Sequence, residues 1–340
     1  MPRDPQPLTI GSRRVGPGAS VFIIAEAGVN HDGRLEQALQ LVDAAADVGA
    51  DAVKFQTFET ERLVARQAPQ YEMLRRLELS APDHRALQSA CRRRDILFLS
   101  SPFDEHSADL LEALGVEAFK VPSGELTNLS LVTHVAAKGK PVILSTGMAV
   151  LDEVRAAVAA LEAAGNRQAV LLHCVSRYPA QPHEANLRAM QTLADAFALP
   201  VGYSDHTLGI DVALAAVALG ACVIEKHLTL DATLPGPDHH ASLPPHEFSS
   251  MVCGIRTVEA ALGHGRKEPA VSEADTAAVA RKSLVAARQI QAGAVVTDEA
   301  LAVKRPGTGL PPAMKRCLVG RRAVQDIPVD TVLTLEMFSS

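Results

Sequence analysis

The sequence predicts an α/β fold, a (β/α)8 TIM barrel followed by a small α+β module. Eight short apolar runs alternate with amphipathic, Ala- and Leu-rich helical segments about 25–30 residues apart, which is the rhythm of such a barrel. Polar side chains gather where the runs end, and a weak internal repeat follows the last helical segment. A doubly wound open sheet is the alternative fold, but it usually has fewer strands, and no GxGxxG motif follows the first run.

The apolar runs are the predicted strands of the barrel, because each is short and rich in β-branched residues. Helices are expected between them, for example over residues 35–49 and 152–165, with a last helix over about residues 246–262. Residues 8–20 predict a small β-hairpin, since Gly and Pro mark its turns. The predicted strands cover residues 21–28, 52–58, 97–103, 118–124, 142–148, 170–176, 200–205 and 223–229.

The expected domains are a barrel over residues 1–265 and a C-terminal module over residues 283–340. Residues 266–282 between them are polar and patternless, which is typical of a linker.

The C-terminal module contains the internal repeat. Residues 288–301 align with residues 325–338 at an offset of 37 residues, so that Ile290 matches Ile327. Two similar short units predict a compact, pseudo-symmetric module. The segment between them is rich in Pro and Gly, predicts a defined loop, and contains Arg305.

Composition narrows the class of protein. The chain has 340 residues, 47% of them hydrophobic and 21% charged, with a net charge of −6, so a packed core is expected. No basic run or long apolar stretch occurs, so neither nucleic acid nor a membrane is an expected partner. The N-terminus lacks a signal core, and the five cysteines are scattered without a CxxC pair, so the cytoplasm is the expected compartment.

Two histidines follow neighbouring predicted strands. His206 comes directly after residues 200–205, and His227 closes the run that begins at residue 223. A single histidine in such a place is more often simply packed, but parallel strands end side by side, so this pair can share one cation.

The other predicted strand ends carry hydroxyl, amide and charged side chains. Chemistry in a (β/α)8 barrel sits at these C-terminal ends. Buried lysines at positions 54 and 120 need anionic partners, either a carboxylate such as Glu26 or Glu125 or a phosphate or carboxylate ligand. The polar residues at the ends are Glu26, Lys54, Gln56, Ser101, Lys120, Ser123, Glu125, Ser145, Ser176, Tyr178, Ser204 and Glu225.

A series of motifs runs in order from about residue 20 to the C-terminus, among them AEAGVNHDG at residues 25–33, FKVPSGEL at 119–126, GYSDHTLG at 202–209, EKHLT at 225–229, PGPDH at 235–239 and KRPGTG at 304–309. In these motifs the chain resembles the sialic acid synthases, which condense phosphoenolpyruvate with an N-acetylated hexosamine. GYSDHT, EKH and KRPG in that order are the specific part of the resemblance. The C-terminal module resembles the antifreeze-like (SAF) domain of that family.

The resemblance implies a role for each matching position. It makes His206 and His227 ligands of a divalent ion, Mn²⁺ or Mg²⁺, and both are implied to be catalytic together with Glu26, beside the reacting carbons. Arg305 matches an arginine that one subunit inserts into the partner's barrel, which implies a domain-swapped homodimer. Phosphoenolpyruvate is implied at Lys54, Ser101, Lys120, Ser123, Ser145 and Ser204, and the sugar at Gln56, Glu125, Tyr178 and Asp238, while Ser176 stands where some members carry Asn.

The activity implied first is that of an N-acetylneuraminate synthase using N-acetylmannosamine or a close hexosamine. The departure at Ser176 and the ARKSL segment at residues 280–284 keep open a legionaminate or pseudaminate synthase that uses a 2,4-diacetamido-trideoxyhexose. Two remoter alternatives are a Schiff-base aldolase with Lys54 or Lys120 as nucleophile and a carbohydrate-binding protein without catalysis.

Overall fold

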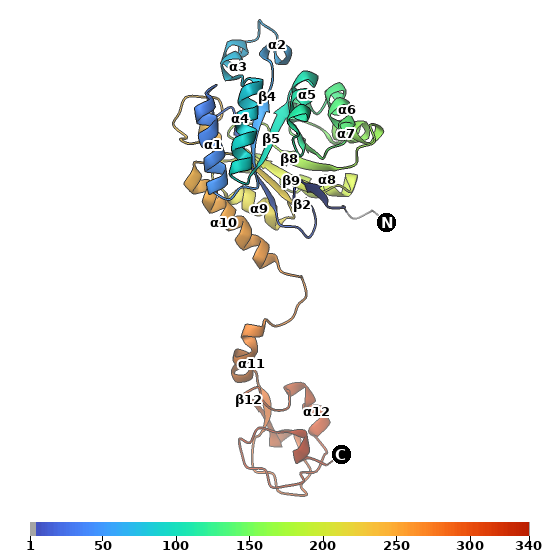
Figure 1. Ribbon diagram of the computed structural model, residues 1–340. Helices are drawn as coiled ribbons and strands as arrows, with labels where there is room; N and C mark the ends of the chain where they lie inside the picture. The colour runs from blue at the N-terminus through green and yellow to red at the C-terminus, as the bar shows by residue number, and fades with distance from the viewer. Residues whose placement is uncertain (1–4, 340) are drawn as a thin grey trace. The chain divides into compact units, whose positions relative to one another are not determined.

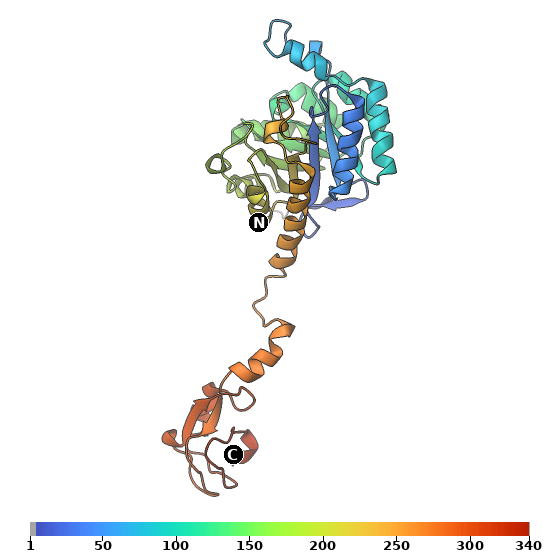
Figure 2. The same ribbon diagram turned by 90° about the vertical axis from the view of Figure 1, so that its left-hand side faces the viewer.

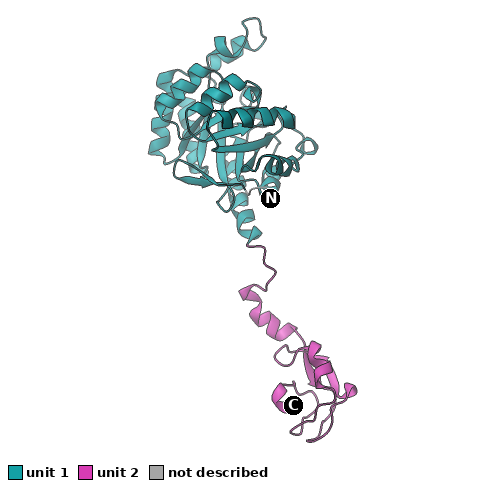
Figure 3. Ribbon diagram, turned by 90° about the vertical axis from the view of Figure 1, so that its right-hand side faces the viewer, with its two compact units in different colours: residues 1–263 teal, residues 264–340 magenta. Residues whose placement is uncertain are grey.

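The computed structural model describes residues 5–339. It divides into two compact units, residues 1–263 and residues 264–340 (Figure 3).

The first unit is a barrel of eight parallel strands surrounded by helices (Figure 1, Figure 2). The strand order is β5-β4-β3-β10-β9-β8-β7-β6, and the barrel closes where β5 and β6 pack against each other. The predicted fold class is confirmed. The strands are β3 (Phe22–Gly28), β4 (Ala52–Thr57), β5 (Leu97–Pro102), β6 (Phe119–Val121), β7 (Val142–Ser145), β8 (Ala169–Cys174), β9 (Val201–Asp205) and β10 (Val223–His227).

A helix follows each strand and covers the outside of the barrel. The face of each helix toward the strands is apolar; in α1, for example, Leu41, Val42 and Ala45 are fully buried. Two short helices, α2 (Thr60–Leu63) and α3 (Tyr71–Leu77), are inserted between β4 and α4. The eight covering helices are α1 (Leu35–Asp47), α4 (Ala81–Arg93), α5 (Glu105–Leu114), α6 (Leu129–Ala137), α7 (Leu151–Ala163), α8 (Ala189–Phe197), α9 (Asp211–Ala218) and α10 (Pro245–Leu262).

β6 is shorter than the predicted run over residues 118–124. Pro122 ends the strand because it has no N–H to continue the ladder, and the chain turns into the 3-10 helix η1 (Ser123–Glu125). Ser123 therefore sits on a turn above the strand end rather than in the sheet.

The two ends of the barrel differ in polarity. Strands β1 (Leu8–Ile10) and β2 (Arg13–Val15) form the predicted hairpin, and Ile10 and Val15 join the apolar cluster inside the barrel. That cluster includes Phe22, Leu99 and Ile143. An apolar plug therefore fills the amino-terminal half of the barrel, and polar side chains inside it are confined to the carboxyl-terminal half.

The second unit contains short elements around its own core. β11 (Ser283–Ala286) pairs antiparallel with β12 (Leu301–Lys304), and Ile290 bridges Ile327, the two positions matched by the internal repeat. The 3-10 helices η5 (Asp298–Ala300) and η7 (Leu335–Met337) also stand at matching places of the repeat. The remaining elements are η4 (Val271–Glu273), α11 (Ala274–Ala280), η6 (Pro312–Met314) and α12 (Lys315–Leu318).

The segment predicted as a linker is not wholly irregular, because it contains η4 and α11. Among the helices of residues 5–339, none combines the length and hydropathy needed to cross a membrane. All five cysteines are free thiols.

Candidate active site

A polar cavity of about 300 Å³ opens at the carboxyl ends of the barrel strands. Its walls come from all eight strands or the loops that follow them, as expected for a (β/α)8 barrel. Twelve of the residues predicted from the sequence line it: Glu26, Lys54, Gln56, Ser101, Lys120, Ser123, Ser145, Ser176, Tyr178, Ser204, His206 and His227.

Strand alternation explains why these side chains meet. Successive residues of a strand point to opposite sides of the sheet, so Ser204 and His206 face the cavity whereas Asp205 points out toward the helices. In β10, Glu225 and His227 face the cavity in the same way. The parallel register places Glu225 beside Ser204.

Two lysines and two carboxylates form one buried network in the cavity. The Lys54 Nζ lies 2.7 Å from the Glu26 Oε2 and donates to the Ser101 Oγ at 3.1 Å. The Glu225 Oε1 lies 3.3 Å from the Lys120 Nζ and 3.8 Å from the Lys54 Nζ. The Ser204 hydroxyl donates to the same carboxylate oxygen at 3.2 Å.

Burial shifts the pKa values of this network. Burial raises the pKa of Glu26 to about 7, and the nearby charge of Glu225 adds to the effect, although Lys54 opposes it. Burial also acts on Glu225, but Lys120 and Lys54 outweigh it and lower the pKa of that carboxyl. Burial lowers the pKa of Lys120; at Lys54 the two carboxylates outweigh burial and raise the pKa. Lys54 and Glu225 are therefore charged, and Glu26 titrates near neutrality.

The two predicted metal-ligand histidines lie side by side. Their ring centroids are 5.3 Å apart, with 58° between the ring planes. The Tyr178 ring packs on His206 with centroids 4.1 Å apart and meets His227 edge-on at 5.5 Å. His206 Nδ1 is 2.7 Å from the carbonyl oxygen of Val175. A neutral His206 donates there, which leaves the Nε2 lone pair free for a ligand.

The residues present fit a divalent cation. His227 Nδ1 is buried without a hydrogen-bond partner among residues 5–339, and the Asp238 Oδ2 lies 3.7 Å from it. Burial, followed by the positive charges around it, holds the pKa of His227 well below its usual value, so this imidazole is neutral and can ligate. Within the described part of the chain, no group of three or more His, Cys, Asp or Glu side chains is arranged to hold a metal. A bound cation would therefore take two imidazoles from the protein and its other ligands from water or substrate.

Three predicted site residues do not line the cavity. Asp238 lies beside it, next to His227. Glu125 ends η1 and accepts a hydrogen bond from Asn128 at 2.8 Å, while its neighbours Ser123 and Gly124 line the cavity. Arg305 lies in the second unit, where its Nε donates to the carbonyl oxygen of Ala280 at 3.1 Å. Its predicted role in a partner's barrel stays a prediction.

Glu225 and Cys174 are two polar cavity residues to which the sequence assigned no role. Glu225 stands at a predicted strand end, and its place two residues before His227, on the same face, is the signal that could have found it. The Cys174 Sγ lies 3.6 Å from the Ser123 Oγ and 3.8 Å from the His206 Nδ1. Burial raises the pKa of this thiol, but the hydrogen bonds with His206 and Ser123 and the charge of Lys120 act together to lower it below its ordinary value.

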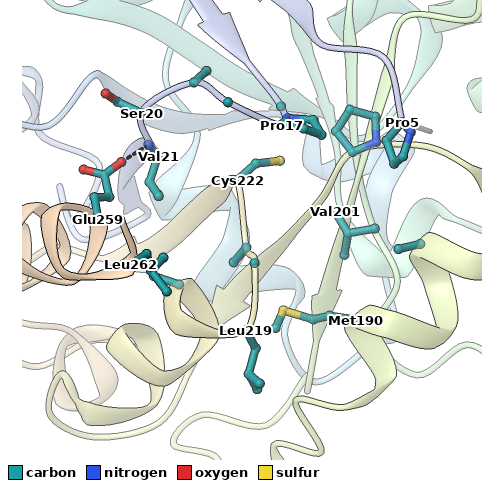
Figure 4. A pocket seen from close by; sticks show the side chains of 18 of the residues that line it. Pro5, Pro17, Ser20, Val21, Met190, Val201, Leu219, Cys222, Glu259 and Leu262 are labelled. Carbon is teal, nitrogen blue, oxygen red and sulfur yellow. Dashed lines mark hydrogen bonds between the residues drawn. The ribbon is translucent and has the colours of Figure 1, made fainter. Parts of the chain in front are cut away.

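A larger cavity of about 660 Å³ lies at the opposite, amino-terminal end of the barrel (Figure 4). Its lining is mainly apolar and includes Met190, Leu219, Cys222 and Leu262. Glu259, a charged residue at its rim, accepts a hydrogen bond from the backbone N–H of Val21. No convergent set of acid, base and cation lines it among the described residues, so the smaller polar cavity is the candidate active site.

Comparisons with known proteins point the same way. The chain is 48% identical to the N,N'-diacetyllegionaminic acid synthase of Legionella pneumophila, over 96% of this chain and 97% of that protein. It is 36% identical to the human N-acetylneuraminate-9-phosphate synthase, over 96% and 94%. The crystal structure of an N-acetylneuraminic acid (sialic acid) synthetase from Leptospira borgpetersenii superposes with a TM-score of 0.77 at 39% identity, covering 81% of this chain and 96% of that one.

Two family models match consecutive parts of the chain. The SAF domain model matches residues 281–339, and the NeuB family model matches residues 41–267, which is most of the barrel. This chain therefore belongs to the NeuB family and carries a C-terminal SAF domain.

Proposed function

We propose that this protein is a phosphoenolpyruvate-dependent synthase of the sialic acid type. It joins C3 of phosphoenolpyruvate to the aldehyde carbon of an N-acetylated hexosamine and releases a nine-carbon sugar acid and phosphate. The observation that carries the proposal is the convergence of two buried lysines, several hydroxyl groups and two imidazoles in one cavity. The names of the two similar synthases, of N,N'-diacetyllegionaminic acid and of N-acetylneuraminate 9-phosphate, support it.

The lysines and hydroxyls suit the anionic substrate. Lys54 and Lys120 place two buried ammonium groups around one carboxylate, so a phosphate and a carboxylate group of a ligand can each find a charged donor. The Ser145 Oγ is buried and has no hydrogen-bond partner within residues 5–339, which leaves it free to bind a ligand oxygen. Phosphoenolpyruvate is small enough for a cavity of about 300 Å³ to hold it beside a sugar aldehyde.

His206 and His227 would hold Mn²⁺ or Mg²⁺. Bound there, such an ion acts as a Lewis acid on a carbonyl oxygen. The two carboxylates already balance the two lysines, so additional positive charge is needed when a multiply charged anion enters the cavity.

The residues of this chain have defined tasks in the reaction. Lys54 and Lys120 orient phosphoenolpyruvate so that its C3 carbon faces the aldehyde, and a new C–C bond forms while the aldehyde oxygen takes up a proton from protonated Glu26. Positive charge then develops at C2, where Glu26 stabilises it and takes a proton from the water that adds there. A carboxylate whose pKa is about 7 is suited to this exchange at neutral pH. The C2–O bond to phosphate then breaks and the departing phosphate, held by the lysines, takes the proton of the C2 hydroxyl, which leaves a ketone at C2.

Sequence similarity favours a 2,4-diacetamido-trideoxyhexose as the acceptor over N-acetylmannosamine, the acceptor expected first. Identity to the legionaminic acid synthase is 48%, compared with 36% to the N-acetylneuraminate-9-phosphate synthase. The same proposal includes a dimer that exchanges its C-terminal units, so that Arg305 reaches the sugar bound by the partner. It also includes a cytoplasmic location, where phosphoenolpyruvate is available.

The direct test is phosphate release from phosphoenolpyruvate with Mn²⁺ and each of three sugars: N-acetylmannosamine, its 6-phosphate and a 2,4-diacetamido-trideoxyhexose. We expect the fastest release with the diacetamido sugar, and loss of release in Lys120→Met. The matched control is Lys138→Met, because Lys138 pairs with Asp109 and Glu112 away from the cavity. Absence of release with all three sugars would refute the proposal.

Borohydride trapping separates this reaction from a Schiff-base aldolase. A Schiff base requires a neutral amine, and Lys54 is held charged by Glu225 and Glu26. Burial lowers the pKa of Lys120, so Lys120 is the lysine that the trapping experiment has to test. Incubation with pyruvate and borohydride should leave the protein unlabelled, whereas an aldolase would gain the mass of the reduced adduct.

A further inference from the structure

A fully buried ion pair lies directly behind the two histidines. The Lys226 Nζ lies 2.7 Å from the Asp205 Oδ2, and both side chains have no exposed surface. Lys226 also donates to the carbonyl oxygen of Thr207. The second Asp205 oxygen accepts hydrogen bonds from the backbone N–H of Thr207 at 2.9 Å and from its hydroxyl at 2.7 Å.

Each member of this pair is adjacent in the chain to a histidine. Asp205 and Thr207 flank His206, and Lys226 precedes His227. None of these three lines the cavity, because alternation turns them to the outer side of the barrel. The pair thus ties the end of β9 to the end of β10 from behind, at the register step where Lys226 is opposite Asp205.

The side chains of the two histidines are held unequally. His206 is fixed at Nδ1 by Val175 and packed under Tyr178. His227 Nδ1 has no hydrogen-bond partner in the described chain. The Tyr178 ring and the Asp238 carboxylate lie near the His227 ring, but neither forms a hydrogen bond with its Nδ1. The backbone beside the ring, which Lys226 anchors, therefore contributes to its position.

Stabilisation of the fold does not by itself explain why the chain buries the ion pair between Lys226 and Asp205. Two charges buried without any exposed surface lose their hydration, and a well-packed apolar pair of the same volume is often at least as stable. A salt bridge with fixed geometry, however, sets the spacing of two strand ends in a way that apolar packing does not.

We propose that Lys226 and Asp205 are positioning residues that hold the His206 and His227 rings at the separation a shared divalent cation requires. This inference rests on the metal site of the proposed function. The pair touches neither cation nor substrate; it acts through the backbone of the two ligand residues.

The test measures Mn²⁺ binding by the substrate-free protein, from the electron paramagnetic resonance signal of free Mn²⁺. The main variant is the double substitution Lys226→Met with Asp205→Asn, which removes both charges together. The Asn oxygen can still accept the hydrogen bonds from Thr207, so the fold is kept. The single variant Lys226→Met leaves a buried unpaired carboxylate and is made only for comparison of stability.

The control is Asp51→Asn. Asp51 is a buried carboxylate outside the cavity that pairs with Arg13 and Arg256 and accepts from the Ile23 N–H. The substitution removes a buried carboxylate charge of the same barrel, paired with two partly exposed arginines, at a residue that belongs to neither β9 nor β10. Thermal melts of all variants identify those that are folded.

We expect the double variant to bind Mn²⁺ about 10–100-fold more weakly than the unaltered protein, the range typical for loss of residues that support metal ligands. Asp51→Asn should retain the original affinity. Equal affinity in the double variant and the unaltered protein would overturn the inference and leave the proposed function intact. An equal loss in Asp51→Asn would also overturn it, because the effect would then be general destabilisation. If the unaltered protein binds no Mn²⁺, the metal site of the proposed function fails and this inference fails with it.

Discussion

Glu225 offers the sharpest test of the buried charge network. Its Oε1 lies 3.3 Å from the Lys120 Nζ and 3.8 Å from the Lys54 Nζ. Glu225→Gln keeps the shape of the side chain but removes its charge. Lys54 keeps Glu26 at 2.7 Å, whereas Lys120 loses the one carboxylate partner found within salt-bridge distance among residues 5–339.

Coulomb's law sets the scale of the loss. At an effective dielectric constant of about 20, the shorter pair is worth about 5 kcal/mol and the longer pair about 4 kcal/mol. The mutation also removes the cost of burying the carboxylate charge, so the net loss is smaller. Breaking a buried pair typically costs about 3–5 kcal/mol. At roughly 2 °C per kcal/mol for a unit of this size, the Tm of the barrel falls by about 6–10 °C.

The assay is thermal unfolding with and without phosphoenolpyruvate. The unpaired Lys120 of Glu225→Gln should gain more from an anionic ligand than Lys120 of the unaltered protein does, so the ligand should raise the Tm of the variant by a larger amount. The conservative comparison is Glu225→Asp, which keeps the charge. Tm values of Glu225→Gln within about 1 °C of the original, or a ligand effect no larger than in the original, would refute the assigned network.

The remaining predictions concern pH, metal, the second unit and a helix cap. Burial lowers the pKa of His31 to about 4, so the unfolded chain takes up the proton first, and stability should fall by roughly 3 kcal/mol between about pH 6.5 and 4. Denaturant unfolding should show a smaller pH slope in His31→Asn, and an unchanged slope would contradict the assignment. EDTA should abolish phosphate release and added Mn²⁺ should restore it; full activity in EDTA would exclude a required cation. Arg305→Ala should raise the KM for the sugar without changing the Tm of the barrel, while Lys304→Ala, at the neighbouring position, should not; equal KM values would argue against an exchanged arginine. Ser80→Ala should cost about 1 kcal/mol, because Ser80 and Asp83 form the capping box of α4, and an unaltered Tm would show that the cap contributes nothing.

Local pattern was enough to predict the barrel and most of its polar end. Alternation within a strand depends on consecutive residues, so the run ending at His227 already placed Glu225 on the same face. The same pattern placed Lys54 and Lys120 at strand ends, where they now line the cavity. The short β6 was the exception, since Pro122 interrupted a run that otherwise read as continuous.

Which partner each charge finds was not visible in the sequence. Lys54 was expected to pair with Glu26 or Glu125, and it pairs with Glu26 and Glu225, whereas Glu125 lies outside the cavity wall. Glu225 and Lys120 come from strands on different sides of the barrel, so their separation depends on how the sheet closes.

By itself the sequence determined the (β/α)8 barrel, the polar strand ends and the two histidines at the ends of neighbouring strands. Each of these features depends only on the spacing of residues along the chain. The tertiary structure decided the register between the first and last strands of the barrel, which places His227 opposite Glu26. It also decided that the Glu225 carboxylate lies between Lys54 and Lys120, and that Lys226 forms an ion pair with Asp205 behind the histidines. These contacts join residues far apart in the chain, and their distances arise only when the sheet curves and closes on itself.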